Sequence, residues 1–286
     1  MTLPRLASTP SATAITLRLA LASGVLLSGL TAPSMRAALV LMSRASEVGH
    51  IDMLKPELER LAGLRLDNAN KLIERLLTSA IDIPAGDDPD NGEPVFDELS
   101  YTPGIEKRFA GVITGHLSPA FRSAVGSMRR AGTMQIEIDV LRRLTTIPGI
   151  IMYLRLQAER QRSPRESVFR IRLRDTDAFG WFGQYCRQAS TGRKNAAGDE
   201  FRSISLGRIF RHLIEPGIRD LGDALNDMDI DAVAGIPEAA VRGRAWSHVD
   251  IVARRLKRVS IKDLADRQDE QARHRGRVEA QRAKSA

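Results

Sequence analysis

Residues 203–225 read SISLGRIFRHLIEPGIRDLGDAL, and this stretch decides the fold class of the chain. Its apolar residues recur every three or four positions, which is the spacing of one face of a helix. The apolar face consists of Leu206, Phe210, Leu213, Ile214, Ile218 and Leu221. The opposite face consists of Arg208, Arg211, His212, Glu215 and Arg219. The pattern predicts one long amphipathic helix with its cations turned outward.

Predicted strands flank this helix on both sides. Phe169, Ile171 and Leu173 alternate with polar residues, as in a half-buried strand. After the helix, residues 232–235 and 246–253 read as the two strands of a hairpin. Upstream, residues 138–159 form a long apolar-periodic segment that Pro148-Gly149 interrupts. A helical segment, a second helix and then a β-hairpin follow one another in this half of the chain. This order is typical of a winged helix.

The first half of the chain has a similar order of elements. Helices are expected at residues 33–45, 55–62, 67–79 and 117–125, and short strands at residues 81–83, 95–101 and 108–114. Asp67 is the expected N-cap of the third segment, and Gly63 ends the second. The helices at 55–62 and 67–79 therefore make a helix-turn-helix candidate, with the strands as its wing.

We therefore predict an α+β fold, mainly helical, with two tandem winged-helix domains. The predicted boundaries are an N-terminal extension at 1–32, a first winged helix at 33–127, a second at 128–260 and a basic tail at 261–286. The stretch 126–132, rich in Gly and Arg, is the predicted linker. The early apolar run at 19–30 also resembles a secretory signal, but Arg18 lies late and the run is too short to span a bilayer.

The composition favours a polyanionic partner and indicates no enzyme. The 286 residues carry a net charge of +8, and from Arg254 onward eleven Lys or Arg face five Asp or Glu. No phosphate-binding loop is present, and the five histidines lack metal-ligand spacing. Four acidic residues have EF-hand-like spacing, but Ala232 replaces the required glycine, so we expect a turn after the long helix. The sequence thus predicts no catalytic residue, no metal, no cofactor and no small-molecule substrate.

The outward residues of both candidate helices have the chemistry that reads double-stranded DNA. Arginine donates to guanine and asparagine pairs with adenine, while serine and basic residues contact phosphate. Arg242-Gly243-Arg244 lies at the predicted hairpin tip, which suits phosphate or the minor groove. The full set of predicted DNA-binding residues is Asn68, Asn70, Lys71, Arg75, Ser203, Ser205, Arg208, Arg211, His212, Arg242, Arg244, Arg254 and Arg255.

The segment Leu213-Ile214-Glu215-Pro216-Gly217-Ile218-Arg219-Asp220-Leu221 resembles a helix of the iteron-binding plasmid replication initiators. In that family a leucine, a proline, a small residue, an aliphatic residue and an acidic residue recur there, and a wing with a Gly-Arg pair follows. Residues 144–156 resemble an upstream helix of the same family. The resemblance extends loosely over residues 35–258, and it departs at Gly149, Gly207 and Gly217, which are unusual in helices.

The resemblance implies a non-enzymatic, cytoplasmic initiator that binds repeated DNA sites at an origin and represses its own gene. It also implies partners: the host replication initiator and helicase machinery, and a homodimer in equilibrium with the monomer. Two alternatives stay open at this point. One is a winged-helix transcriptional regulator without an initiator role, and the other is an exported, membrane-associated protein.

Overall fold

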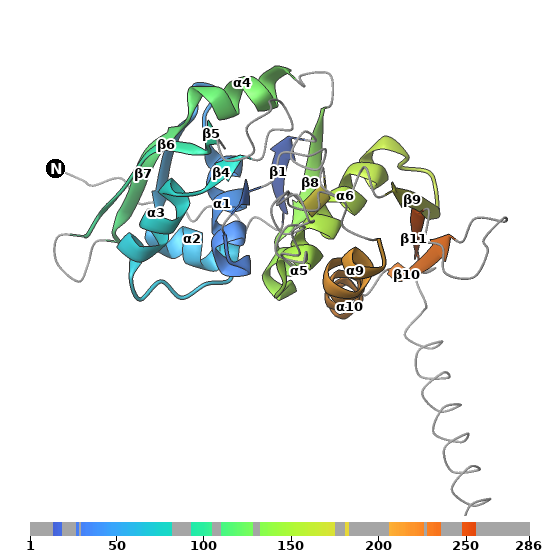
Figure 1. Ribbon diagram of the computed structural model, residues 1–286. Coiled ribbons are helices and arrows are strands. Elements are labelled where there is room, and N and C mark those ends of the chain that lie inside the picture. The colour runs from blue at the N-terminus through green and yellow to red at the C-terminus, as the bar shows by residue number, and fades with distance from the viewer. Residues whose placement is uncertain are drawn as a thin grey trace, which may run out of the picture.

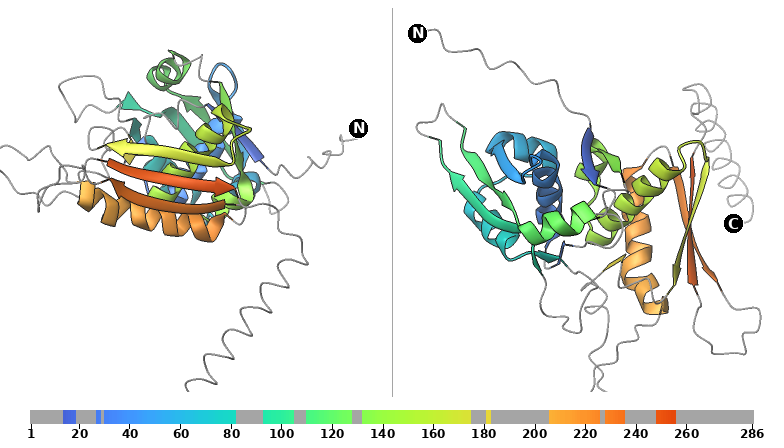
Figure 2. Two further views of the ribbon diagram at one scale, coloured as in Figure 1. Left: turned by 90° about the vertical axis from the view of Figure 1, so that its right-hand side faces the viewer. Right: turned by 90° about the horizontal axis from the view of Figure 1, so that it is seen from above.

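The computed structural model describes residues 14–18, 27–28, 30–81, 93–104, 110–127, 132–174, 181–182, 206–225, 228–235 and 248–255. The chain mixes helices and sheets. Two three-stranded antiparallel sheets lie at opposite ends of the molecule, and most of the helices lie between them (Figures 1 and 2). Each of these sheets belongs to one half of the chain. We call residues 27–127 the front half and residues 132–255 the back half.

The front half begins with the short strand β2 and ends with helix α4. Its elements are β2 (Leu27–Ser28), α1 (Ala32–Arg44), β3 (His50–Leu54), α2 (Lys55–Ala62), α3 (Ala69–Leu77), β4 (Ala80–Ile81), β5 (Glu93–Pro94), β6 (Phe96–Thr102), β7 (Val112–Leu117) and α4 (Pro119–Ser127). The sheet order is β3-β7-β6, and β2, β4 and β5 form a smaller sheet.

The predicted pair of helices in the front half is confirmed as α2 and α3. Pro56 occupies the first turn of α2, where its missing N–H costs nothing, and Gly63 ends the helix at φ 61°, a conformation that favours glycine. The prediction that Asp67 caps α3 is wrong. Asn68 is the cap, because its Oδ1 accepts from the backbone N–H of Lys71 at 3.1 Å.

The front strands and the closing helix lie later in the chain than predicted. We expected a strand at 108–114, but β7 runs over Val112–Leu117, and its pairing with β3 and β6 buries Ile113 and Leu117. Leu117 therefore belongs to the strand and not to the next helix. Helix α4 starts at Pro119, with the Oγ of Ser118 accepting from the N–H of Phe121 at 3.0 Å. It continues to Ser127, so the first part of the predicted linker is helical.

The N-terminal segment contributes to the fold, contrary to the prediction of a separate extension. Strand β1 (Ala14–Arg18) pairs antiparallel with β8 (Thr133–Glu137), which was not predicted. Ile15 and Leu17 are buried against the same core as α1. Residues before and after the front half are thus joined in one two-stranded sheet.

The back half contains the predicted long helix and hairpin. Its further elements are α5 (Ile138–Arg143), α6 (Ile147–Arg162), β9 (Val168–Arg174), α9 (Leu206–Ile209), the π-helical turn η3 (Phe210–Ile214), α10 (Glu215–Ala224), β10 (Met228–Gly235) and β11 (His248–Arg255). The sheet order is β10-β11-β9. The hairpin prediction is confirmed, with a longer first strand and a second strand that lies two residues later than predicted.

Two details of the back half differ from the prediction. The break in residues 138–159 comes before Pro148, because Thr146 caps α6 through a bond from the N–H of Gly149 to its Oγ1 at 3.1 Å and Pro148 occupies the first turn. The turn expected after the long helix is a strand, since Asp229 and Asp231 lie in β10. The other acidic residues of that spacing, at 227 and 238, lie outside the described residues.

One buried cluster connects the two halves. It includes Leu39 of α1, Leu61 of α2, Leu141 of α5 and Tyr153 of α6. Tyr153 is fully buried, and its hydroxyl accepts from the N–H of Glu137 at 3.0 Å; burial raises its pKa. Among the helices of the described ranges, none is both long and apolar enough to cross a membrane.

Candidate nucleic-acid interface

The long helix of the back half has the two faces that the sequence predicts. Over residues 206–224 the buried side carries Leu206, Leu213 and Leu221, whereas Arg211 and His212 are exposed. Figure 2 shows this helix beside the sheet of β9, β11 and β10. Arg208 is half-buried and Arg219 is exposed opposite Glu215, with 3.7 Å between charged atoms; an exposed pair of this kind contributes little to stability.

A π-helical turn divides the helix and was not predicted. The N–H of Glu215 donates to the carbonyl of Phe210, five residues back. The next residue, Pro216, has no N–H and cannot close the following α-helical bond, so a wider turn precedes it. The turn spans Arg211 and His212, and it therefore sets the direction in which these exposed side chains leave the helix.

Helices α10 and α6 approach so closely that two glycines are required. A Cβ added to Gly217 would lie 2.6 Å from the Sδ of Met152, and a Cβ on Gly149 would lie 2.1 Å from an oxygen of Asp220. Gly149 and Gly217 are two of the three positions at which a glycine is unusual because the segment is helical. The third, Gly207, has open space around it. Close helix packing thus explains Gly149 and Gly217.

Asp220 of α10 holds the corner between α5 and α6. Its carboxylate accepts from the N–H and Oγ1 of Thr146 at 2.9 and 2.8 Å. It also accepts from the N–H of Thr145 at 3.0 Å and from the Oγ1 of Thr145 at 2.9 Å. The charge lies at the N-terminus of α6, where the helix dipole favours an anion. The acidic position of the family-like segment is therefore a docking residue, a role that the sequence alone did not indicate.

Helix α3 presents the predicted polar face of the front half. Asn70, Lys71 and Arg75 are exposed, while Leu72 and Leu76 are buried toward β6. The Oδ1 of Asn68 is occupied by its capping bond, so this residue stabilises the helix. Four of the predicted contacts thus lie on α3 or at its N-cap, and all four residues are exposed.

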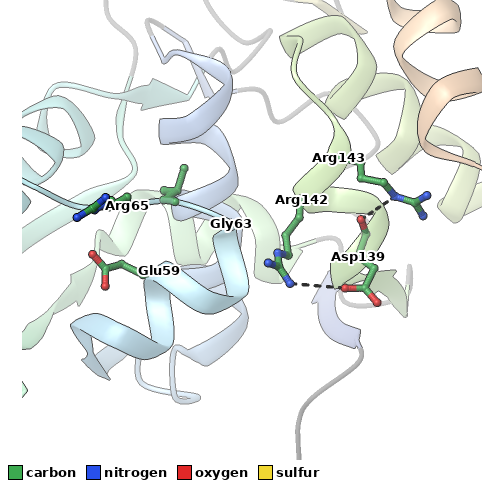
Figure 3. A pocket seen from close by; sticks show the side chains of 7 residues that line it. Glu59, Gly63, Arg65, Asp139, Arg142 and Arg143 are labelled. Atoms are coloured by element: carbon green, nitrogen blue, oxygen red, sulfur yellow. Dashed lines mark hydrogen bonds and ion pairs between the residues drawn. The ribbon is translucent and has the colours of Figure 1, made fainter.

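A cleft with three arginines separates the turn after α2 from α5 (Figure 3). Its lining residues are Glu59, Gly63, Leu64, Arg65, Asp139, Arg142 and Arg143. Oε1 of Glu59 accepts a hydrogen bond from the backbone N–H of Leu66 at 2.7 Å. Oδ1 of Asp139 lies 3.7 Å from Nη1 of Arg142. The two acids offset part of the positive charge. This cleft was not predicted, although the adjacent arginines at 142 and 143 are visible in the sequence.

A buried arginine joins the halves behind this cleft. Arg36 of α1 is 8% exposed, and its Nη1 donates to the carbonyl of Arg142 at the end of α5. Burial lowers its pKa, while the nearby Asp220 acts in the opposite direction. A buried guanidinium with a partner across the junction opposes separation of the halves, because separation would leave that carbonyl without its bond.

The sheet at the end of the back half carries further cations. Arg172 of β9 makes a two-pronged contact with Asp250 of β11 at 2.8 and 3.0 Å, and this holds the pKa of Asp250 below its usual range. Arg254 is exposed and 3.4 Å from Asp229. Arg255, the last of the predicted DNA contacts, is half-buried. Its guanidinium stacks on the Phe169 ring at 5.3 Å and donates to a backbone carbonyl at 3.1 Å.

The remaining predicted contacts lie outside the described residues. These are Ser203, Ser205, Arg242 and Arg244, and the basic tail at 261–286. Within the described part, the structure places the polar faces of α3 and of α9–α10 on separate halves. Figure 1 shows α2 and α5 between these two helices.

Comparison with known proteins supports the fold through structure alone. A scan of protein-family models and a search of curated proteins each found no match. Among solved structures, the chain is similar to the crystal structure of Pi initiator protein in complex with iteron DNA, with a TM-score of 0.58 and 14% sequence identity. The match covers 86% of this chain and 98% of that chain. The protein therefore has the fold of an iteron-binding replication initiator, and this similarity of fold extends over both halves of the chain.

Proposed function

We propose that this protein is a plasmid replication initiator that binds repeated sites of double-stranded DNA at an origin. The observation that carries the proposal is the match to an initiator bound to iteron DNA over 86% of the chain. Because that match extends over both halves, it supports the interpretation of each half as a winged helix, with α3 and α9–α10 as the reading helices.

The exposed side chains of the two helices support separate DNA contacts by each helix. Arg211 and His212 lie on α9–α10, and Asn70, Lys71 and Arg75 lie on α3. Arginine and asparagine side chains pair with base edges in the major groove, whereas lysine contacts phosphate as a point charge. We propose that each helix enters one major groove and that the two grooves lie about one helical turn apart.

The contacts between the halves support binding by one chain. The buried cluster, the β1–β8 pair and the Arg36 bond hold the two helices in a common frame. A single chain with two reading helices suits an asymmetric site, whereas a palindrome suits a symmetric dimer with one helix per chain. We therefore propose that the monomer binds direct repeats, and that a homodimer represses the protein's own gene.

The same proposal includes the partners of the protein and the absence of a catalytic activity. The protein would open duplex near the repeats and recruit the host initiator and helicase in the cytoplasm, with no catalytic step, cofactor or small-molecule substrate of its own. Among the described residues, no group of three His, Cys, Asp or Glu side chains converges on one point.

Selection of binding sites from a random duplex library with the full-length protein tests the proposal. We expect recovered sites to be non-palindromic and about two helical turns long, with monomeric protein protecting each site. Lys71→Ala and Arg211→Ala should each remove protection from one end of the site. Recovery of palindromes bound by dimers, with no non-palindromic site bound by the monomer, would favour a transcriptional regulator and contradict the initiator proposal.

A replication assay then separates initiation from simple binding. A circular DNA that carries only this gene, its flanking DNA and a selectable marker should replicate in a host cell that otherwise cannot maintain it. Arg211→Ala should abolish replication in the same assay, since the reading helix would no longer recognise the repeats. Site-specific binding without replication would support the regulator instead.

A further inference from the structure

The cleft between the turn after α2 and α5 lies between the two reading helices. Figure 1 shows α2 and α5 in the middle of the molecule, with α3 on one side and α9–α10 on the other. If each reading helix enters one major groove of the same duplex, the sugar-phosphate backbone between the two grooves passes this middle part. The cleft therefore faces a ligand of high negative charge density.

Three arginines follow one another along the cleft. Figure 3 shows Arg65 on the side of α2, and Arg142 and Arg143 on α5. Their guanidinium groups are spread along the cleft and do not point toward one common centre (Figure 3). A compact anion can contact only part of this row, whereas an extended polyanion such as a DNA strand can contact all of it.

The two arginines of α5 are positioned by contacts of their own. Gly63 ends α2, and a Cβ added to it would lie 2.8 Å from Cγ of Arg142, so the stem of this arginine packs against the turn. The backbone carbonyl of Arg142 accepts from the buried Arg36. Nε of Arg143 donates to the carbonyl of Asp139 at 3.1 Å, so its two terminal NH₂ groups can donate to a ligand. Such preorganisation lowers the entropy cost of binding.

Two carboxylates line the same cleft and oppose an anion there. Glu59 accepts from the N–H of Leu66 and lies 3.7 Å from Nζ of Lys55, so its charge is compensated within the front half. The side chain of Asp139 is 79% exposed and lies beside Arg142. Asp139 therefore competes with an anionic ligand for this guanidinium, and its removal should strengthen binding of that ligand.

The cleft does not suit a free small molecule. Its volume is about 680 Å³, but five of its seven lining residues are charged. Pockets for small ligands are lined mainly by apolar side chains, with only a few polar groups. The lining favours a ligand that is held at other points as well.

We propose that Arg65, Arg142 and Arg143 bind phosphate groups of the DNA backbone between the two major grooves. The contact rests on the proposed function, because it needs both reading helices on one duplex. It carries no information about base sequence, since phosphates are the same in every sequence, and it fixes the position of the duplex on the protein.

The salt dependence of DNA affinity, measured with the full-length protein, tests the phosphate contacts. Arg65→Ala and Arg143→Ala should each reduce the slope of log affinity against log salt by about 1, on the selected site and on random duplex alike. Arg122→Ala is the matched control, because Arg122 is exposed on α4, away from α2 and α5 in Figure 1, and it should leave the slope unchanged. Asp139→Asn should raise the affinity for both duplexes by about two- to fivefold.

Duplexes with uncharged methylphosphonates provide the second readout. Replacing the phosphates at the centre of the selected site should weaken binding of the original protein by about tenfold, but should not weaken binding of the Arg65→Ala, Arg143→Ala double variant further. Equal losses in both proteins would overturn the proposal, as would unchanged slopes in the two single variants. Tight binding of inorganic phosphate that the double variant loses would assign the cleft to a free anion and overturn it as well.

The two proposals fail in different ways. If selection yields no preferred site, the proposed function fails, while the slopes on random duplex still report whether the cleft arginines contact phosphate. If a preferred site is found and the slopes and the methylphosphonate losses do not depend on Arg65 and Arg143, only the cleft contact fails.

Discussion

Replacing Asp220 with alanine is expected to loosen α10 from α6 and to reduce both stability and DNA specificity. The carboxylate accepts bonds from the N–H and the hydroxyl of two threonines. The bonds from Thr146 are partly buried and those from Thr145 are exposed. Counting mainly the partly buried ones, and including the anion at the N-terminus of α6, we expect a loss of about 2–3 kcal/mol.

Urea denaturation of the full-length protein, followed by circular dichroism, measures this loss. Asp223→Ala on the same helix is the matched control, because Asp223 is exposed, and its effect should stay within about 0.5 kcal/mol. Asp220→Asn should fall between the two, since the amide keeps one acceptor oxygen but places an NH₂ group against the threonine donors.

The same variant should also change recognition, because the docked position of α10 determines where Arg211 points. We expect the ratio of cognate to random DNA affinity to fall in Asp220→Ala even under conditions where the variant is fully folded. A loss of stability below about 0.5 kcal/mol, or an unchanged specificity ratio, would refute the argument that this carboxylate positions the reading helix.

The remaining predictions concern single features of the chain. Gly149→Ala should destabilise the protein by about 1–3 kcal/mol in a urea melt because of its close contact with α10, whereas Gly207→Ala, in open space, should stabilise it by about 0.5–1 kcal/mol; equal effects would contradict the packing argument. Arg211→Ala should cost about 1–3 kcal/mol at the cognate site and much less on random DNA, as measured by titration of both duplexes. The pKa of Asp250 is lowered in the folded state, so its pairing stabilises the protein at neutral pH, and this contribution should disappear as the pH falls below about 4; Asp250→Asn should show a shallower acid-side decline in stability. Deleting residues 261–286 should reduce the slope of log affinity against log salt, and an unchanged slope would remove the tail from the DNA interface.

Local rules predicted much of the fold correctly. The 3.6-residue periodicity of residues 203–225 gave the buried and exposed faces of α9–α10, and Gly63 marked the end of α2. Alternation of apolar residues gave β9 and the β10–β11 hairpin. These features depend on neighbours within a few positions, so the sequence contains the information that determines them.

Strand ends and caps were predicted less well, because several nearby residues compete for each role. Asp67 and Asn68 are both good caps, and the backbone of the folded chain selected Asn68. The position of β7 depends on its pairing with β6 and with β3, and β3 lies far away in the sequence. The role of residues 14–18 depends on β8 in the same way.

The sequence by itself determined the two polar helical faces, and with them the set of exposed cations and amides that suits DNA. The tertiary structure decided how those faces are held: it brought Asp220 to the threonines of the α5–α6 corner, required glycine at 149 and 217, buried Arg36 at the junction and placed His50 beside His116. The physical reason is that a helix face follows from the spacing of adjacent residues along one chain segment. Each of these contacts joins two segments that lie far apart in the sequence, as His50 and His116 do at 66 positions, and no local pattern specifies the distance between such segments.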